Sequence, residues 1–269
     1  MPSLPLYQVD AFTDRPFTGN PAAVCPLQAP LPAPLMQQIA AENNLSETAF
    51  FHADGDGFAL RWFTPTVEVD LCGHATLASA LVLMDELDRT RTRAVFHTRS
   101  GALPVEKRGD SFVLDLPARP ATSVDDGVTM DRLQRALGAR PDQLLATRTG
   151  IYLAVLGTAA DVLRLQPDMR ATAELGHTVC ATAPASAAQG ADVDFVSRYF
   201  APSHGIDEDP VTGSAHAILA LYWADRLGKR RLRARQVSAR GGDVECELAG
   251  DRVLVAGQGR LVIKGTLWY

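Results

Sequence analysis

Cysteine is scarce in this sequence, and the four cysteines present are far apart, at Cys25, Cys72, Cys180 and Cys246. They form no Cys-x-x-Cys pair and no Cys/His cluster with zinc-site spacing, so we predict neither a metal site nor a disulfide framework. Long apolar runs are also lacking, because none approaches the roughly 18 residues that span a bilayer. The first residues lack the pattern of a signal peptide. We therefore expect no membrane association and a cytoplasmic location.

Neither sign of charge dominates the composition. The formal net charge is −5, and 21% of the residues are charged. Such a balance provides no basic surface for nucleic acid, so we expect no nucleic-acid partner. No glycine-rich segment has the spacing of a dinucleotide-binding or phosphate-binding loop. We therefore expect no cofactor. A hydrophobic content of 46% is typical of a folded globular protein.

The most informative feature that the sequence does contain is an internal repeat. The segment RWFTP (61–65) precedes DLCGHAT (70–76), and RYFAP (198–202) precedes DPVTGSAH (209–216). Each second segment contains a glycine, Gly73 or Gly213, and a largely apolar stretch begins two residues after it. This repetition predicts two related halves. We place the boundary in the Pro- and Ser-containing stretch 117–127, which gives domains 1–119 and 120–269, with the last strand free to pack back on the first half.

The predicted helices 75–84 and 215–224 are apolar on nearly every face, which excludes an amphipathic surface position. Each must therefore be surrounded by the strands of its own half. This predicts an α+β fold of two similar halves, each a barrel-like, mostly antiparallel sheet around a central apolar helix, with an active-site cleft between them. The predicted strands are residues 6–12, 22–25, 48–51, 58–63, 94–98, 111–116, 152–156, 178–183, 194–199, 236–239, 244–248, 253–256 and 261–268.

The starts of the two apolar helices are candidate anion sites. A helix N-terminus presents unpaired backbone N–H groups and a partial positive charge, so it can hold a carboxylate without a basic side chain. Gly73 and Gly213 let a ligand approach that backbone closely. The alternative interpretation is that these glycines only make tight turns. The repetition favours the anion site.

Five segments together resemble a known family. They are Phe12 with residues 17–24, then residues 44–50, 61–65, 70–76 and 209–215. In this order they resemble the PhzF family of phenazine-biosynthesis isomerases, which shares its fold with diaminopimelate epimerase. The resemblance implies a cofactor-independent isomerase, commonly a homodimer, that moves a proton on a small carboxylate-bearing metabolite. The dihydro-hydroxyanthranilate of phenazine biosynthesis is one candidate substrate.

The resemblance also implies which residues act. It makes Glu47 the general acid/base, with His74 and Asp209 as catalytic partners. Glu47 lies next to apolar residues, which disfavour the charged carboxylate and so suit it to abstract a carbon-bound proton. A helix N-terminus lowers the pKa of a histidine, so we expect a neutral His74. The candidate substrate-binding residues are Asn20, Gly73, Gly213 and Ser214, followed by Cys72, Ser46 and Thr212.

Each of these residues also has a structural interpretation. Glu47 could end a strand at the surface, and His74 could simply start a helix. Ser214 could be a helix cap, and Asp209 a turn former before its proline. Only their place in the repeated motifs favours the functional interpretation.

Cys72 is the thiol nearest the first glycine motif. The epimerase and racemase relatives use two thiols on opposite faces of the substrate carbon, whereas this sequence has a thiol in the first motif only. We therefore predict that Cys72 is a small buried residue. The alternative to an isomerase is a catalytically silent small-molecule-binding protein of the same fold, since a fold does not fix a function.

Overall fold

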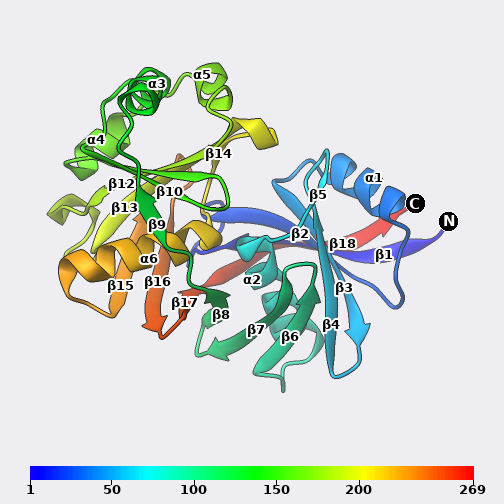
Figure 1. Ribbon diagram of the computed structural model, residues 1–269. Coiled ribbons are helices and arrows are strands. Elements are labelled where there is room, and N and C mark those ends of the chain that lie inside the picture. Colours follow the sequence, from blue (N-terminus) through cyan, green and yellow to red (C-terminus); the bar gives the residue numbers. More distant parts are fainter. The chain divides into compact units, whose positions relative to one another are not determined.

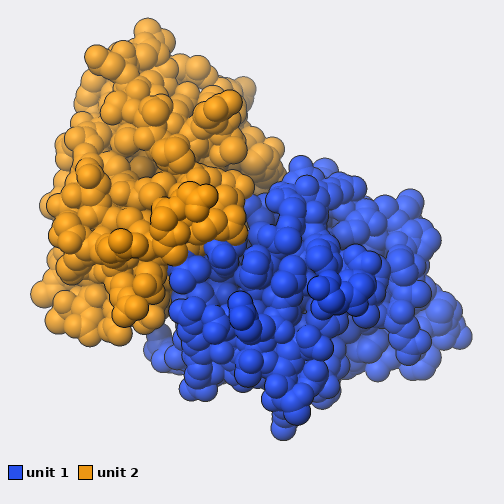
Figure 2. Space-filling model, turned by 60° about the horizontal axis from the view of Figure 1, so that its bottom comes forward, with its two compact units in different colours: residues 1–116, 254–269 blue, residues 117–253 orange.

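The computed structural model describes residues 1–269 and has a mixed α+β fold with two compact units (Figure 2). Unit 1 consists of Met1–Leu116 and Leu254–Tyr269, and unit 2 is Pro117–Val253. Strand β1 (Ser3–Ala11) pairs along its whole length with β18 (Gly259–Trp268). The two ends of the chain therefore lie side by side in unit 1 (Figure 1).

Unit 1 is a sheet of antiparallel and parallel strand pairs with helices on both faces (Figure 1). Besides β1 and β18, its elements are β2 (Asn20–Pro26), α1 (Ala33–Asn43), β3 (Glu47–Asp54), β4 (Gly57–Phe63), β5 (Glu68–Val69), α2 (Gly73–Leu81), a π-helical segment (Val82–Leu87), β6 (Arg93–Thr98), β7 (Gly101–Arg108), β8 (Ser111–Pro117) and the end of β17 (Arg252–Gly257).

Strands β2 and β3 are buried on both faces, and each face has its own helix. Cys25 and Phe50 pack in one apolar cluster with Met36 and Ile39 of α1. Successive side chains of a strand point to opposite faces. The intervening positions of β2 and β3 therefore face away from α1, towards α2, which packs against both strands. Every residue of α2 is buried, as its apolar composition predicted.

Unit 2 has the same kind of layering. Its elements are β9 (Ala121–Ser123), α3 (Gly127–Leu137), β10 (Gln143–Thr147), β11 (Ile151–Val155), α4 (Ala159–Arg164), α5 (Met169–Ala173), β12 (Thr178–Pro184), short helical turns at Ala187–Gln189 and Pro202–His204, β13 (Phe195–Ala201), β14 (Ile206–Asp209), α6 (Gly213–Leu227), β15 (Arg231–Gln236) and β16 (Gly242–Ala249).

Strand β12 shows how unit 2 uses both faces of its sheet. Val179 and Ala181 belong to the apolar cluster that includes Leu133 of α3 and Val162 of α4. On the other face, the Thr182 hydroxyl accepts a hydrogen bond of 3.0 Å from the indole of Trp223 in α6. Helix α6 therefore lies opposite α3 and α4, and the predicted surrounding of the second apolar helix is confirmed.

The repeated Arg-x-Phe segments have a structural role in both units. In unit 1 the guanidinium of Arg61 on β4 makes two hydrogen bonds of 2.7 Å to Glu68 on β5, and it lies 5.2 Å from the ring centroid of Phe63. In unit 2, Arg198 on β13 bonds Glu208 on β14 at 2.7 and 2.8 Å, 4.9 Å from the ring of Phe200. Each Arg–Glu pair joins the two strands of the short hairpin that precedes a glycine motif.

The strands differ from the sequence prediction at several places, and β5, β9, β10 and β14 were not predicted. Strand β7 was not predicted, because Pro104 interrupts its pattern, yet Pro104 pairs with Val95 of β6. The predicted strand 236–239 is wrong: β15 ends at Gln236, and the chain then turns. β15 alternates Arg and apolar residues from Arg231, so this strand begins five residues before the predicted start at Gln236.

No helix is both long and apolar enough to cross a membrane.

We expect the two repeated arginines to contribute unequally to stability. The Arg198 side chain is 13% exposed and also donates to the carbonyl of Leu165, whereas Arg61 is 34% exposed and its partner Glu68 has a second cation, Arg99, at 2.7 Å. Arg198→Met should lower the free energy of unfolding by about 3 kcal/mol, since it leaves a partly buried carboxylate unpaired. Arg61→Met should cost about 1 kcal/mol. Urea unfolding of both variants checks this, and equal losses would contradict it.

Candidate active site

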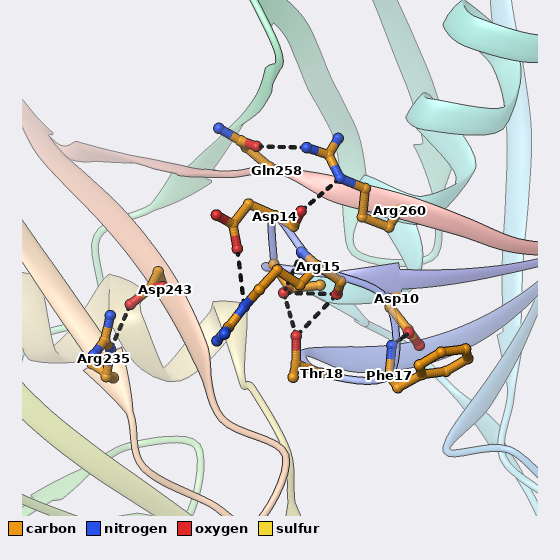
Figure 3. A network of polar contacts seen from close by, with 10 residues as sticks. Asp10, Asp14, Arg15, Phe17, Thr18, Arg235, Asp243, Gln258 and Arg260 are labelled. Atoms are coloured by element: carbon orange, nitrogen blue, oxygen red, sulfur yellow. Dashed lines mark hydrogen bonds and ion pairs between the residues drawn. The ribbon is translucent and has the colours of Figure 1, made fainter.

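The loop between β1 and β2 delivers Asn20 to the first motif. The backbone N–H of Phe17 donates to Asp10 at 2.7 Å, and the Arg260 guanidinium donates to the Asp14 carbonyl at 2.8 Å (Figure 3). Gly19 has φ +70°, and a Cβ there would lie 2.3 Å from a carbonyl oxygen of β1. Only glycine fits this position. Asn20 then begins β2 fully buried.

The strand alternation that builds the core also orients Glu47. Phe50 faces α1, so Glu47, three positions earlier, faces the opposite side, towards α2. Glu47 is paired in parallel register with Ala22 of β2, two residues after Asn20. Both polar side chains therefore lie on the α2 face of the sheet, and the Glu47 side chain is only 11% exposed.

The start of α2 brings a thiol and an imidazole to this face. Cys72 is the N-cap residue, and no side-chain hydrogen bond caps the helix. His74 Nδ1 lies 3.1 Å from the amide nitrogen of Asn20 and 3.5 Å from Cys72 Sγ. His74 Nε2 lies 3.1 Å from Glu47 Oε2. These last two atoms form an ion pair without the alignment of a hydrogen bond.

The electrostatics of this cluster correct one sequence prediction. Burial by itself lowers the pKa of His74, but Cys72 and Glu47 raise it, and the net pKa lies well above the usual value. The expected lowered pKa of His74 is therefore wrong, because the helix N-terminus is a weaker influence than a carboxylate in contact. Burial raises the pKa of the Cys72 thiol to about 11, and the Glu47 carboxylate adds to this. Cys72 is thus a neutral thiol near pH 7, as expected for a buried residue.

The second motif is organised by a residue that the sequence analysis missed, Gln236 at the end of β15. Its side chain is fully buried and accepts from the N–H of Thr212 at 2.8 Å. Its amide nitrogen donates to the carbonyl of Asp209 at 2.7 Å. The Thr212 hydroxyl in turn donates to the Asp209 carboxylate. No spacing or motif marks this glutamine in the sequence, because its partners are backbone groups of a distant turn.

Helix α6 begins directly after this turn, in the same manner as α2. Thr212 is its N-cap, Gly213 is buried and Ser214 is half-buried in the first turn; no side-chain hydrogen bond caps the helix. His216 donates from Nδ1 to the Thr212 carbonyl at 2.8 Å, and Thr76 donates likewise to Cys72 at 2.6 Å in α2. The two motifs therefore share a helix start as well as a sequence.

The predicted site residues form two groups in the structure. In unit 1, Glu47, His74, Cys72 and Asn20 come together, with Gly73 beside them in the chain. The group in unit 2 contains Asp209, Thr212, Gly213 and Ser214. Ser46 precedes β3 and is half-buried.

Comparisons with known proteins agree over almost the entire chain. Residues 9–265 match the PhzC-PhzF family of phenazine biosynthesis-like proteins. An uncharacterized isomerase of Pseudomonas aeruginosa is 49% identical over 264 residues, which cover 98% of each chain. The crystal structure of a PhzF-family phenazine biosynthesis protein from Enterococcus faecalis is 42% identical, with a TM-score of 0.92 and 100% coverage of both chains.

A more distant likeness extends to epimerases. A hydroxyproline epimerase from Agrobacterium vitis has a TM-score of 0.62, with coverage of 98% of this chain and 92% of the epimerase. At 11% identity this likeness shows the fold alone.

Gln236→Leu should destabilise the second motif. The change leaves the Thr212 N–H and the Asp209 carbonyl buried without their partner, which we expect to cost about 2–4 kcal/mol. Urea unfolding measures the loss, and hydrogen exchange at the Thr212 amide should accelerate. The matched control is Gln166→Leu at an exposed position. Unchanged protection of the Thr212 amide would contradict the assignment.

His216 should make the protein sensitive to acid. Burial lowers its pKa from 6.5 to about 4, and its carbonyl partner offsets this only in part. The unfolded chain therefore binds the proton more readily, so this contribution to stability is present above pH 6.5 and is lost as the pH falls towards 4. The loss should approach about 3 kcal/mol. Unfolding measured across this range should be less pH-dependent in His216→Asn than in wild type or in the exposed control His204→Asn; identical profiles would contradict this.

Proposed function

The chain belongs to the PhzF family of phenazine biosynthesis-like proteins and is an isomerase, and from this premise we propose that Glu47 moves the proton. In this proposal the Glu47 carboxylate removes a proton from a carbon of a small carboxylate-bearing metabolite and returns it at another carbon, with no cofactor. The observation that carries the proposal is the contact of 3.1 Å between Glu47 Oε2 and His74 Nε2, whose side chains are 11% and 4% exposed.

The buried contact supports proton transfer in two ways. A carboxylate with little exposure has few water molecules to displace before it reacts. The adjacent imidazole can stabilise the carboxylate or exchange a proton with it, since Cys72 and Glu47 raise the pKa of His74 against the effect of burial. Asn20 holds the opposite ring nitrogen at 3.1 Å and so fixes the ring orientation. We assign Asn20 as a positioning residue that also lies next to the substrate.

The starts of the two apolar helices support carboxylate binding. No side-chain hydrogen bond caps either α2 or α6, so backbone N–H groups of their first turns remain available to an anion. We propose that Gly73 and Gly213 admit the substrate to this backbone and that Ser214 donates a hydrogen bond to it. Asp209 is proposed as a second proton-transferring group. We propose smaller contributions to substrate binding from Thr212, Ser46 and Cys72, which neighbour these groups.

The wider context of the enzyme follows from the family resemblance. We propose a cytoplasmic homodimer that acts in phenazine-like or other secondary metabolism. A dihydro-hydroxyanthranilate is the first substrate to test, within a panel of small unsaturated carboxylates.

Glu47→Gln should abolish substrate proton exchange. We expect thermal shift against the carboxylate panel to identify a ligand, and NMR in deuterated solvent to show incorporation of deuterium into that ligand by the wild type. The amide cannot act as a base, so exchange should fall by about 10²–10⁴-fold. Ligand binding should persist, because the helix starts are unchanged.

Glu42→Gln is the matched control, because this glutamate is exposed at the end of α1. It should exchange like the wild type. Undiminished exchange by Glu47→Gln would refute its role as the base. A ligand that stabilises the wild type but never exchanges a proton would instead favour a silent binding protein.

A further inference from the structure

Glu47, Cys72 and His74 bring three different metal-binding groups into one buried place. One ligand atom from each side chain can be chosen so that all three lie within 4.8 Å of one another. The residues are 8%, 5% and 4% exposed. No motif marks this group in the sequence, because Glu47 lies on β3, 25 residues before Cys72. We call these three residues the Glu-Cys-His cluster.

From this arrangement we propose that the Glu-Cys-His cluster binds a borderline-soft divalent cation such as Zn²⁺, with Glu47, Cys72 and His74 as its protein ligands. Thiolate and imidazole favour Zn²⁺ or Co²⁺, whereas Mg²⁺ and Ca²⁺ prefer sites made of oxygen atoms. Three protein ligands leave one position of a tetrahedral ion open, which is the pattern of reactive rather than structural zinc sites.

The two atoms of the buried ion pair identify where the cation would lie. Glu47 Oε2 and His74 Nε2 are buried and make no hydrogen bond, although they face each other at 3.1 Å. Ligand atoms of a tetrahedral zinc site lie about 3.3–3.6 Å apart. The carboxylate and imidazole are therefore close to the required separation, and Cys72 Sγ, which contacts the other ring nitrogen at 3.5 Å, would have to move to complete the set.

Charge and surroundings also suit a cation. A thiolate, a carboxylate and a neutral imidazole together neutralise a divalent ion, so the occupied site carries no net buried charge. Asn20 contacts His74 Nδ1, the nitrogen opposite the proposed ligand atom, and a rotated amide would present its oxygen to an N–H there. The 11% exposure of the Glu47 side chain provides an opening for the ion.

Metal binding and catalysis then compete for the same groups. A bound ion occupies the carboxylate that we assign as the base, so it should inhibit proton transfer. This consequence rests on the proposed function, whereas the metal site itself does not. The two can therefore fail separately: the spectrum of a bound metal reports the site without any substrate, and proton exchange without metal reports the reaction.

The test is titration of the full-length, chelator-treated protein with Co²⁺, which reports its ligands in the absorption spectrum. We expect a thiolate-to-cobalt charge-transfer band and the intense visible bands of four-coordinate Co²⁺, saturating at one equivalent and displaced by Zn²⁺. Cys72→Ala should lose the charge-transfer band, and Cys72→Ser serves if the alanine variant does not fold. The control Cys25→Ala removes another buried thiol of the same unit and should keep the band.

Calorimetry with Zn²⁺ tests the other two ligands. Glu47→Gln and His74→Gln should each weaken binding by about 10–100-fold or more. The proposal is overturned by a wild type without a saturable charge-transfer band, by a band that persists in Cys72→Ala or Cys72→Ser, or by unchanged Zn²⁺ affinity in Glu47→Gln or His74→Gln.

Discussion

The burial of two largely apolar helices, α2 along its whole length and α6 over most of its length, is the constraint on which the rest of this structure depends. Such a helix must be covered by the strands around it, and its first backbone N–H groups have no acceptor within the helix. In neither α2 nor α6 does a side chain form a capping hydrogen bond with those groups. The first backbone N–H groups of both helices therefore need a hydrogen-bond acceptor, and a carboxylate ligand can be that acceptor. The scaffold and the proposed binding site arise from the same feature.

The two copies of the internal repeat share the residues that build the scaffold, but they differ in the chemical groups at the helix starts. Both units keep an arginine that brackets a glutamate of the next strand and lies over a phenylalanine, and both helix starts receive a side-chain bond to the N-cap carbonyl. The positions that differ are those at the helix start itself, where Cys72 and His74 of one unit correspond to Thr212 and Ser214 of the other. The two units thus support different chemical groups on one framework.

The sequence predicted the features that depend on local composition. It did not predict the features that depend on contacts between residues far apart in the chain. The buried helices followed from their lack of polar residues. Glu47 was found through the family resemblance, because its strand is buried on both faces and alternation alone cannot tell which face is which. Gln236 was placed in a strand that the chain does not form, since its partners are backbone groups of a turn far away in sequence. The charge of His74 was predicted wrongly because its neighbour Glu47 lies on another element.

The two buried histidines show how far one contact determines reactivity. His74 and His216 each follow a helix start and are 4% and 0% exposed, so burial lowers the pKa of both. His216 meets only a carbonyl and an aromatic ring, and its pKa falls to about 4. His74 meets Cys72 and the Glu47 carboxylate, and its pKa rises. Burial and helix position are common to both histidines, so these two neighbours account for the opposite directions of the two pKa shifts.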